Sequence, residues 1–350
     1  MKASVRKGAT LRRPAAPRNN DRRVLGPHPR RRFLRLAAGT AVLPAVSRVA
    51  WAQAYPAKPV RIVAGFPPGG NVDLYARLIG QWLSERIGQQ FFVENRPGAG
   101  GTLATEFVTR AAPDGYTLLL SGSNDAWNTA LYDNLKFDYL RDIAPIASLV
   151  RAVGVLVVNP SFPTKSAPEF MAYAKRNPGK ISVGSSTVGS GSHLYWALFD
   201  RLTAGGTVNV PYRALGQALT DLLGGQVQAA FPNVSSAIEY IRAGRMRALA
   251  VTGAIRAGVL PEVPALGEFI TGYEVTGWIC VGAPRNTPAT VVDRLNREIN
   301  ASLANPRLKQ RIADLGDEIF MSSPAELTSY LAEYTEKWTK VIHAAGIRPG

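Results

Sequence analysis

Residues 60–88 read VRIVAGFPPGGNVDLYARLIGQWLSERIG. The first seven residues, Val60 to Phe66, have the short apolar character of a buried strand. Val72 to Ile87 spaces its apolar residues as on one face of a helix, and Gly88 is a typical helix stop. The stretch therefore predicts a buried strand that turns through Pro67-Pro68-Gly69-Gly70-Asn71 directly into an amphipathic helix.

Strand and helix patterns alternate along the rest of the chain, which predicts an α/β fold with mainly parallel sheets. We expect further strands at residues 91–94, 116–121, 143–150, 152–158, 181–185, 208–210, 227–231, 247–251 and 275–283. We expect further helices at residues 102–111 and from starts near Ser166, Ser192, Leu215, Val234, Thr287 and Ser323. Thr287-Pro288 is typical of an N-cap followed by a first helical proline, and Ser323-Pro324-Ala325-Glu326 of a capping box.

The chain is long enough for two lobes rather than one core. Asn159-Pro160 interrupts the first run of elements, so we place a boundary near residue 158. The helices after residue 283 have no sheet of their own, and we expect the chain to return to the first lobe. The predicted domains are a signal region at residues 1–54, a first lobe of 55–157 plus 278–350, and a second lobe of 158–277. The two crossings are expected at 156–159 and 279–283.

An export signal is indicated by Arg30-Arg31-Arg32-Phe33-Leu34-Arg35, a short apolar run and Ala50-Trp51-Ala52-Gln53-Ala54. A twin-arginine pair, a weakly hydrophobic run and small-residue cleavage sites follow one another in such signals. A membrane anchor needs about 20 apolar residues, whereas Gly39 and Pro44 interrupt this run. We therefore predict a periplasmic protein exported by a twin-arginine signal, with cleavage near Ala52 or Ala54.

The net charge of +16 does not indicate a nucleic-acid binder, because most of it lies in the predicted signal region. Residues 1–54 hold 13 Lys or Arg and one Asp, so the remainder carries about +4. The single cysteine, Cys280, excludes an intramolecular disulfide and is expected to be a small buried hydrophobe. The three histidines lie far apart and no cysteine pair exists, so we expect no metal site and no cofactor.

Glycine-rich turns after predicted strands are the candidate ligand-binding elements. The turn from Phe66 to Asn71 leaves backbone N–H groups free at the positive end of a helix dipole, which suits an anion. The turn from Gly184 to His193 adds serine hydroxyls as donors, and 95–101 and 121–124 follow other strands. Ligands bind beyond the carboxyl ends of strands in open sheets, so these loops should converge on a cleft. The alternative is that the glycines only serve tight turns.

Two other kinds of site fit these turns less well. Residues 184–190 have the spacing of a phosphate loop but lack its lysine. Ser190 or Ser192 beside His193 suggests an exported hydrolase, yet adjacent residues on one turn rarely form a triad and the G-x-S-x-G motif is absent. Asp73, in the first helical turn, is expected to favour the helix dipole and to orient the loop before it.

Several ordered blocks resemble the Bug-type receptors of tripartite tricarboxylate transporters, over about residues 55–347. In the first predicted lobe the blocks are Tyr55-Pro56-Ala57-Lys58-Pro59-Val60, Phe66-Pro67-Pro68-Gly69-Gly70, Val93-Glu94-Asn95-Arg96-Pro97-Gly98-Ala99-Gly100-Gly101 and Pro113-Asp114-Gly115-Tyr116-Thr117-Leu118. In the second they are Gly191-Ser192-His193-Leu194, Val210-Pro211-Tyr212-Arg213, Asp221-Leu222-Leu223-Gly224-Gly225-Gln226-Val227 and Arg247-Ala248-Leu249-Ala250-Val251-Thr252.

This resemblance implies a two-lobed Venus-flytrap architecture, the type II periplasmic-binding-protein fold, with two parallel-rich sheets and a cleft. It implies a receptor, not an enzyme, that closes on a small organic carboxylate and delivers it to the membrane permease subunits of the transporter. A receptor that instead senses a ligand for a membrane signalling partner stays open as an alternative. We expect a monomer without a nucleic-acid partner.

The ligand-binding residues predicted from the turns and the resemblance are Phe66, Pro68, Gly69, Gly70, Asn71, Asp73, Ser121, Ser123, Ser186, Thr187, Ser190, Gly191, Ser192, His193, Arg213 and Asn233. The chain departs from the family pattern at Trp196-Ala197, at Arg213-Ala214 and around Phe231. These departures bear on the identity of the ligand more than on the fold. The extra cation of Arg213 suggests an anionic ligand, unless the side chain is solvated or paired with Asp221.

Overall fold

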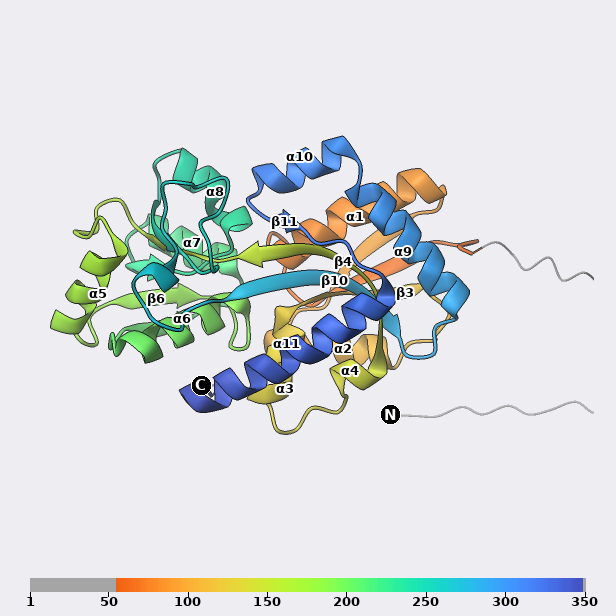
Figure 1. Cartoon of the computed structure of the whole chain (residues 1–350), viewed down its shortest axis with the longest axis horizontal. Helices are drawn as coiled ribbons and strands as arrows, with labels where there is room; N and C mark the ends of the chain where they lie inside the picture. Colours follow the sequence, from red (N-terminus) through yellow and green to blue (C-terminus); the bar gives the residue numbers. More distant parts are fainter. Residues whose placement is uncertain (1–54, 349–350) are drawn as a thin grey trace, which may run out of the picture. The chain divides into compact units, whose positions relative to one another are not determined.

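The computed structural model describes residues 55–348 of the chain. The predicted export signal and its cleavage sites lie outside the described residues. Figure 1 traces the described elements in sequence order.

Two mixed β-sheets organise the fold. The first has the order β11-β4-β10-β3-β1-β2 and the second the order β7-β6-β8-β5-β9. The strands of the first are β1 (Val60–Ala64), β2 (Phe91–Asn95), β3 (Thr117–Gly122), β4 (Ile143–Val153), β10 (Thr276–Pro284) and β11 (Glu318–Ile319). Those of the second are β5 (Val155–Val158), β6 (Ser182–Ser185), β7 (Val208–Pro211), β8 (Ala229–Ala230) and β9 (Arg247–Val251). The predicted two-lobed α/β fold is confirmed.

Parallel and antiparallel strands share each sheet. β1 pairs in parallel with β2 and β3, and β6 with β7 and β8, as the βα repeats predict. The other pairs, β3–β10, β4–β10, β4–β11, β5–β8 and β5–β9, are antiparallel. The sheets are therefore less rich in parallel pairs than expected, because the strands that cross between them run against their neighbours.

Helices cover both faces of both sheets (Figure 1). Around the first sheet lie α1 (Asn71–Ile87), α2 (Thr102–Thr109), α3 (Ser123–Leu131), α4 (Tyr139–Asp142), α9 (Ala289–Leu303), α10 (Pro306–Asp314) and α11 (Pro324–Ala345). Around the second lie α5 (Ala167–Arg176), α6 (Gly191–Thr203), α7 (Leu215–Leu223) and α8 (Val234–Arg242). Short 3₁₀ turns occur at Ala99–Gly101 and Leu266–Glu268. The C-terminal helices α9 to α11 thus lie around the first sheet.

Strand alternation divides the core. In β1, Ile62 packs in the cluster with α1 and α9, whereas its neighbour Val63 packs in the cluster with α2, α3 and α11. In β5, Val157 faces α7 and α8, whereas Leu156 joins the same large cluster as Val63. One apolar cluster therefore runs through both lobes.

The chain changes sheet at two points. β4 and β5 are separated only by Gly154, and the chain returns through β10, which begins at Thr276. Both points fall a few residues before the expected crossings. A Cβ atom at Gly154 would lie 2.5 Å from Tyr195 Cδ2, so this junction requires glycine. The sheets fit the predicted lobe boundaries, which themselves stay a prediction.

The helix starts follow the predicted capping signals with one exception. Ser323 Oγ accepts from the Glu326 N–H, and the Ser323 N–H donates to the Glu326 carboxylate at 2.8 Å. The prediction that Thr287 is the N-cap of α9 is wrong. The Thr287 hydroxyl donates to Pro284 O at 2.7 Å, and Pro288 takes the N-cap position.

An aromatic cluster fixes α11 against the crossing strand β10. The ring centroids of Trp338 and Trp127 of α3 lie 6.0 Å apart, and those of Tyr334 and Trp278 of β10 lie 5.8 Å apart. Both pairs pack edge to face. Trp127 also contacts Tyr195 of α6, at 6.1 Å. The C-terminal helix therefore closes the core beside the junction of the lobes.

We predict that Trp338→Ala lowers the free energy of unfolding by about 3–5 kcal/mol, because it empties a fully enclosed aromatic site. Urea denaturation followed by far-UV circular dichroism measures the loss. Lys340→Ala, on the exposed side of the same helix, is the control and should cost less than about 1 kcal/mol. Equal losses in the two variants would contradict the packing role of Trp338.

Candidate functional site

A pocket lies where loops of the two lobes meet. It is lined by Phe66, Pro67, Pro68, Gly70, Asn71, Val72, Gly122, Ser123, Asn124, Trp127, Ala152, Ser186, Ser190, Gly191, Ser192, Tyr195, Ala214, Leu215, Gly216, Asn233, Gly277, Trp278 and Ile279. Its volume is about 100 Å³. One water needs roughly 10–15 Å³ on this scale, so the pocket has room for a small organic molecule or several waters.

Five helices begin at this pocket. Their N-cap residues all line it: Gly70 of α1, Gly122 of α3, Ser190 of α6, Ala214 of α7 and Asn233 of α8. At α1, α7 and α8 no side chain of the N-cap residue bonds the first turn. The N-cap side chains therefore leave first-turn N–H groups to a ligand at the positive ends of the helix dipoles, although the Gln217 and Ser236 N–H groups donate to backbone carbonyl groups.

None of the described residues that line the pocket has a charged side chain. An anion there meets aligned amide dipoles and neutral donors such as Ser123, Ser192 and Asn124, with an apolar wall that includes Trp278 and Leu215. The arrangement can bind a carboxylate together with an apolar carbon skeleton.

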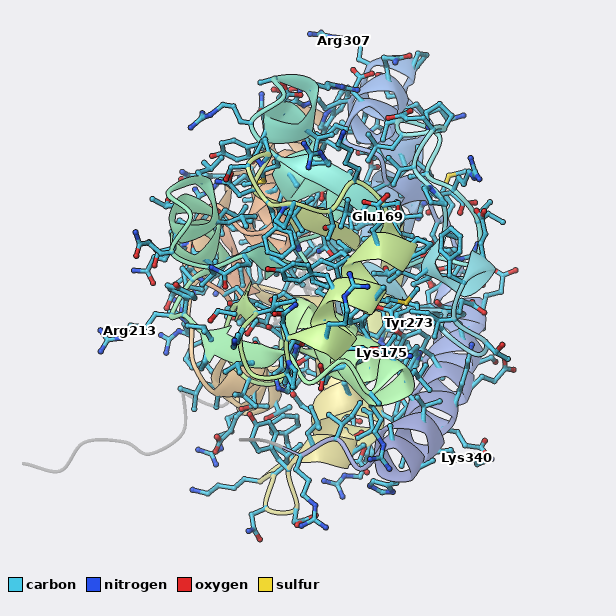
Figure 2. All side chains as sticks on the ribbon, turned by 90° about the vertical axis from the view of Figure 1, so that its left-hand side faces the viewer. Glu169, Lys175, Arg213, Tyr273, Arg307 and Lys340 are labelled. Carbon is cyan, nitrogen blue, oxygen red and sulfur yellow. The ribbon has the colours of Figure 1, made fainter. Side chains whose placement is uncertain are left out.

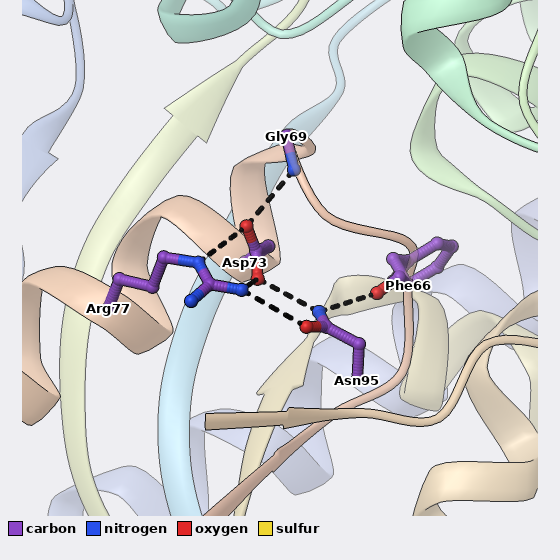
Figure 3. A network of polar contacts seen from close by, with 5 residues as sticks. All are labelled: Phe66, Gly69, Asp73, Arg77 and Asn95. Carbon is purple, nitrogen blue, oxygen red and sulfur yellow. Dashed lines mark hydrogen bonds and ion pairs between the residues drawn. The ribbon is translucent and has the colours of Figure 1, made fainter. Parts of the chain in front are cut away.

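Asp73 holds the loop before α1 in shape, as Figure 3 shows. The Gly69 N–H donates to Asp73 Oδ2 at 3.0 Å, and Asn95 Nδ2 bridges Asp73 Oδ1 (2.8 Å) and Phe66 O (2.9 Å). Arg77 donates to both carboxylate oxygens, at 2.9 and 3.0 Å. These hydrogen bonds, the largest of them from Arg77, outweigh burial and lower the pKa of Asp73. The carboxylate is thus committed to the loop, as predicted, and does not line the pocket.

The loop before α6 is tied together by its own serines. The Ser186 N–H donates to Ser192 Oγ at 2.9 Å, and Ser190 Oγ lies 3.1 Å from Ser192 Oγ. Ser190 Oγ also caps the helix by accepting from the His193 N–H. These contacts place the first turn of α6 against the pocket.

The structure brings ten of the sixteen predicted residues to the pocket and leaves six outside its lining. Lining it are Phe66, Pro68, Gly70, Asn71, Ser123, Ser186, Ser190, Gly191, Ser192 and Asn233; outside it are Gly69, Asp73, Ser121, Thr187, His193 and Arg213. Ser121 is fully buried and donates to Asp125 at 2.6 Å. Arg213 extends away from the ribbon (Figure 2), and Asp221, its suggested partner, accepts instead from Tyr212 at 2.7 Å.

His193 lies in a setting unsuited to catalysis. Its side chain is buried and packs 5.9 Å from Trp196, measured between ring centroids. Burial lowers the pKa of His193 to about 4, so the imidazole is neutral near pH 7. Its Nδ1 has no hydrogen-bond partner in the described part of the chain, and so no acid orients the ring.

The single cysteine also has no nucleophilic role. Cys280 is buried in β10, and burial raises the pKa of its thiol to about 12. The prediction that it is a small buried hydrophobe is confirmed.

Sequence patterns missed the pocket residues that depend on long-range packing. Trp127 and Tyr195 come from the second turns of α3 and α6, and Ala152, Gly277 and Trp278 from the crossing strands. One available signal was helical spacing, because Tyr195 lies three residues after Ser192 on the same helix face.

The lobes touch beside this pocket. The Tyr132 hydroxyl donates to Val188 O at 3.4 Å, across from the first lobe to the second. A Cβ atom added at Gly189 would overlap Asn128 Oδ1, and one added at Gly100 would lie 2.8 Å from Val188 O. The close approach of these loops depends on glycine on both sides.

The family model of the tripartite tricarboxylate transporter family receptor matches residues 75–347. The chain belongs to this family. Its members are periplasmic solute receptors, not enzymes, which bind small carboxylates and work with tripartite transporter permeases. Within residues 55–348, none of the helices is both long and apolar enough to cross a membrane.

Individual members are similar over nearly their whole length. BugT of Bordetella pertussis is 33% identical over 302 residues, which cover 85% of this chain and 92% of BugT. The R. palustris protein Rpa4515, solved with adipate, is 33% identical with a TM-score of 0.80, covering 83% of this chain and 98% of Rpa4515. MatC of Rhodopseudomonas palustris, solved with bound malate, is 31% identical with a TM-score of 0.78, covering 82% and 100%.

We predict that the His193 imidazole stays neutral down to about pH 4, because burial disfavours the imidazolium ion. Nuclear magnetic resonance titration of its ring carbons measures the midpoint, with the urea-unfolded chain as the control. A folded-state midpoint near 6.5 would contradict the buried, unpaired setting of the ring.

Proposed function

We propose that this chain is a periplasmic receptor that captures a small organic carboxylate between its lobes and delivers it to the permease subunits of a tripartite tricarboxylate transporter. The observation that carries the proposal is the convergence of five helix N-termini on a pocket without charged side chains. Such a pocket favours an anion over a cation or a neutral solute. The relatives solved with adipate and malate support the carboxylate class.

The retention of a carboxylate follows from its hydrogen bonds. Each bond from an amide or hydroxyl to a carboxylate oxygen is worth roughly 1.5–3 kcal/mol. Three such bonds, less the cost of immobilising the ligand, give the affinity of a receptor that must also release its cargo. The apolar wall of Trp127, Trp278 and Ile279 receives the carbon skeleton.

The roles of individual residues follow from their places. We assign ligand contact to the first turns of α1, α3, α6 and α7 and to Asn233. We assign loop positioning to Gly69 and Asp73, and no ligand contact to Arg213. Export by the twin-arginine signal, with cleavage near Ala52 or Ala54, and the monomeric state stay predictions.

A ligand screen tests the proposal. Residues 55–350 are titrated with mono-, di- and tricarboxylates, with amino acids and with the matched uncharged amides as controls. Binding at a ligand concentration of about 100 times the dissociation constant should add roughly 2.7 kcal/mol to the free energy of unfolding and raise the melting temperature. The carboxylate assignment would be overturned if the amides stabilised the protein as much as the acids did, or if no acid stabilised it.

We predict that Gly189→Ala weakens the binding of the acid that the screen identifies by at least about tenfold, which is 1.4 kcal/mol. The added methyl group would overlap Asn128 Oδ1 of the first lobe, and Asn128 cannot yield because it is buried and donates to Gly100 O at 2.9 Å. The lobes would then stop short of their present contact. Isothermal titration calorimetry measures the affinity.

Gly225→Ala is the matched control for this variant. Gly225 has φ 76° and Gly189 has φ 81°, so both substitutions carry similar backbone strain. No atom lies within 4 Å of a Cβ atom at Gly225, however, and binding there should stay normal. Equal losses of affinity in the two variants would show that strain, not lobe contact, is responsible.

A further inference from the structure

A buried carboxyl group lies at the boundary between the lobes, away from the pocket lining. Asp317 belongs to the turn between α10 and β11, and its residue is 6% exposed. The Tyr75 hydroxyl, from α1 of the first lobe, donates to Asp317 Oδ2 at 2.7 Å. The other carboxyl oxygen, Oδ1, is buried without a hydrogen-bond partner among the described residues.

The second lobe covers this turn. A Cβ atom at Gly316 would lie 2.6 Å from side-chain atoms of both Val234, in α8, and Val259. Ser235 of α8 faces the carboxyl group closely enough to influence its ionisation. Its hydroxyl is nevertheless buried and outside hydrogen-bonding geometry with any described atom. Two buried polar atoms without a partner among the described residues, one from each lobe, therefore lie at this boundary.

Both neighbours of Asp317 belong to helices that begin at the pocket. Tyr75 lies one turn after Asn71 in α1, and Ser235 lies two residues after Asn233, the N-cap of α8. The carboxyl group is thus placed between the second turn of α1 in the first lobe and the first turn of α8 in the second lobe.

No cation bonds to Asp317 among the described residues. The groups near enough to interact with it are Tyr75 from α1, Ser235 from α8 and Tyr195 from α6, whose hydroxyl donates to Asn233 Oδ1. Arg311 of α10 acts on Tyr75. Glu318, the next residue, points to solvent towards Arg151. Burial raises the pKa of Asp317 to about 7, against smaller opposing effects of the hydroxyl groups of Tyr75 and Ser235.

We propose that Asp317 is a positioning residue whose neutral acid form lets the second lobe close on the first, so that lobe closure takes up a proton. In its neutral form the carboxyl group carries a proton that it can donate to the Ser235 hydroxyl, which pairs the two buried atoms. In its ionised form it would place an uncompensated charge inside the closed boundary. The inference deepens the proposed function, and rests on it in so far as closure retains the ligand.

The direction of the pH dependence follows from linkage. In the open form Asp317 faces water and its pKa is expected to lie near the ordinary value of about 3.9. Its pKa in the closed form is raised to about 7. Closure is therefore fully supported below about pH 4, loses up to about tenfold in its equilibrium constant per pH unit above that, and levels off above about pH 7.

Small-angle X-ray scattering of the ligand-free protein tests the inference without relying on any ligand. The radius of gyration of residues 55–350 is measured at about pH 5 and about pH 8, where linkage predicts closed and more open populations. We expect the wild-type protein to expand at the higher pH. Asp317→Asn keeps an oxygen for Tyr75 and cannot ionise, so it should stay compact at both values.

Two serine variants separate lobe closure from simple packing. Ser235→Ala removes the partner in the second lobe and should give, at about pH 5, the expanded dimensions of wild type at about pH 8. Ser236→Ala, one residue further along α8, should behave as wild type. Circular dichroism checks that each variant folds.

The outcomes are decisive. Equal dimensions of the wild-type protein at both pH values, or the same expansion in Asp317→Asn as in wild type, would overturn the inference. Neither result would affect the carboxylate assignment, which the ligand screen tests separately.

Discussion

The antiparallel ladder of β4 and β10 is the interaction on which the two-lobed structure depends. It runs from the Pro284–Ile143 pair to the Thr276–Val153 pair, and at the Thr276–Val153 end both strands connect to the second sheet. Thr252 fastens this junction: its Oγ accepts from the Gly154 N–H at 2.7 Å and donates to Val275 O at 2.8 Å. The two crossings, at Gly154 and before Thr276, lie side by side because β4 and β10 pair there. The lobes therefore share one narrow hinge, and the loops of both sheets face one pocket.

The preference of that pocket for an anion comes from the backbone N–H groups at the helix starts. The described side chains that line it therefore need no charge. A lysine or arginine in the lining would attract any anion over a distance, and the lobes would have to desolvate it on closure. Helix N-termini carry their partial charge without a mobile side chain, so they lose little entropy when a ligand binds. Their positions depend in turn on Asp73 at α1 and on Ser190 and Ser192 at α6, which are polar residues used for structure.

The sequence allowed prediction of many features that depend on local patterns. The βα units, the turn at Gly69 and Gly70, the capping box at Ser323 and the structural role of Asp73 all follow from neighbours within a few residues. Ser121 lies outside the pocket lining because its hydroxyl donates to Asp125 of α3, a helix whose polar start hid its periodicity. Trp127 and Trp278 were missed because only the register of β10 against β4 brings them together beside the pocket. The pocket therefore needed the tertiary structure, whereas the starts of α1, α6, α7 and α8 around it did not.

Two of the buried carboxyl groups of the first lobe, Asp125 and Asp317, illustrate why burial alone does not make a switch. Asp125 accepts from Thr105, Ser121 and the Gly122 N–H, all within one lobe, so its environment does not change when the lobes move. Burial raises its pKa, but that shift bears on folding and not on closure. Asp317 has one donor in its own lobe and faces the other lobe with an unpaired oxygen. An apolar side chain there would hold the boundary more firmly, and a receptor that must reopen to release its ligand gains from a contact that the loss of a proton weakens.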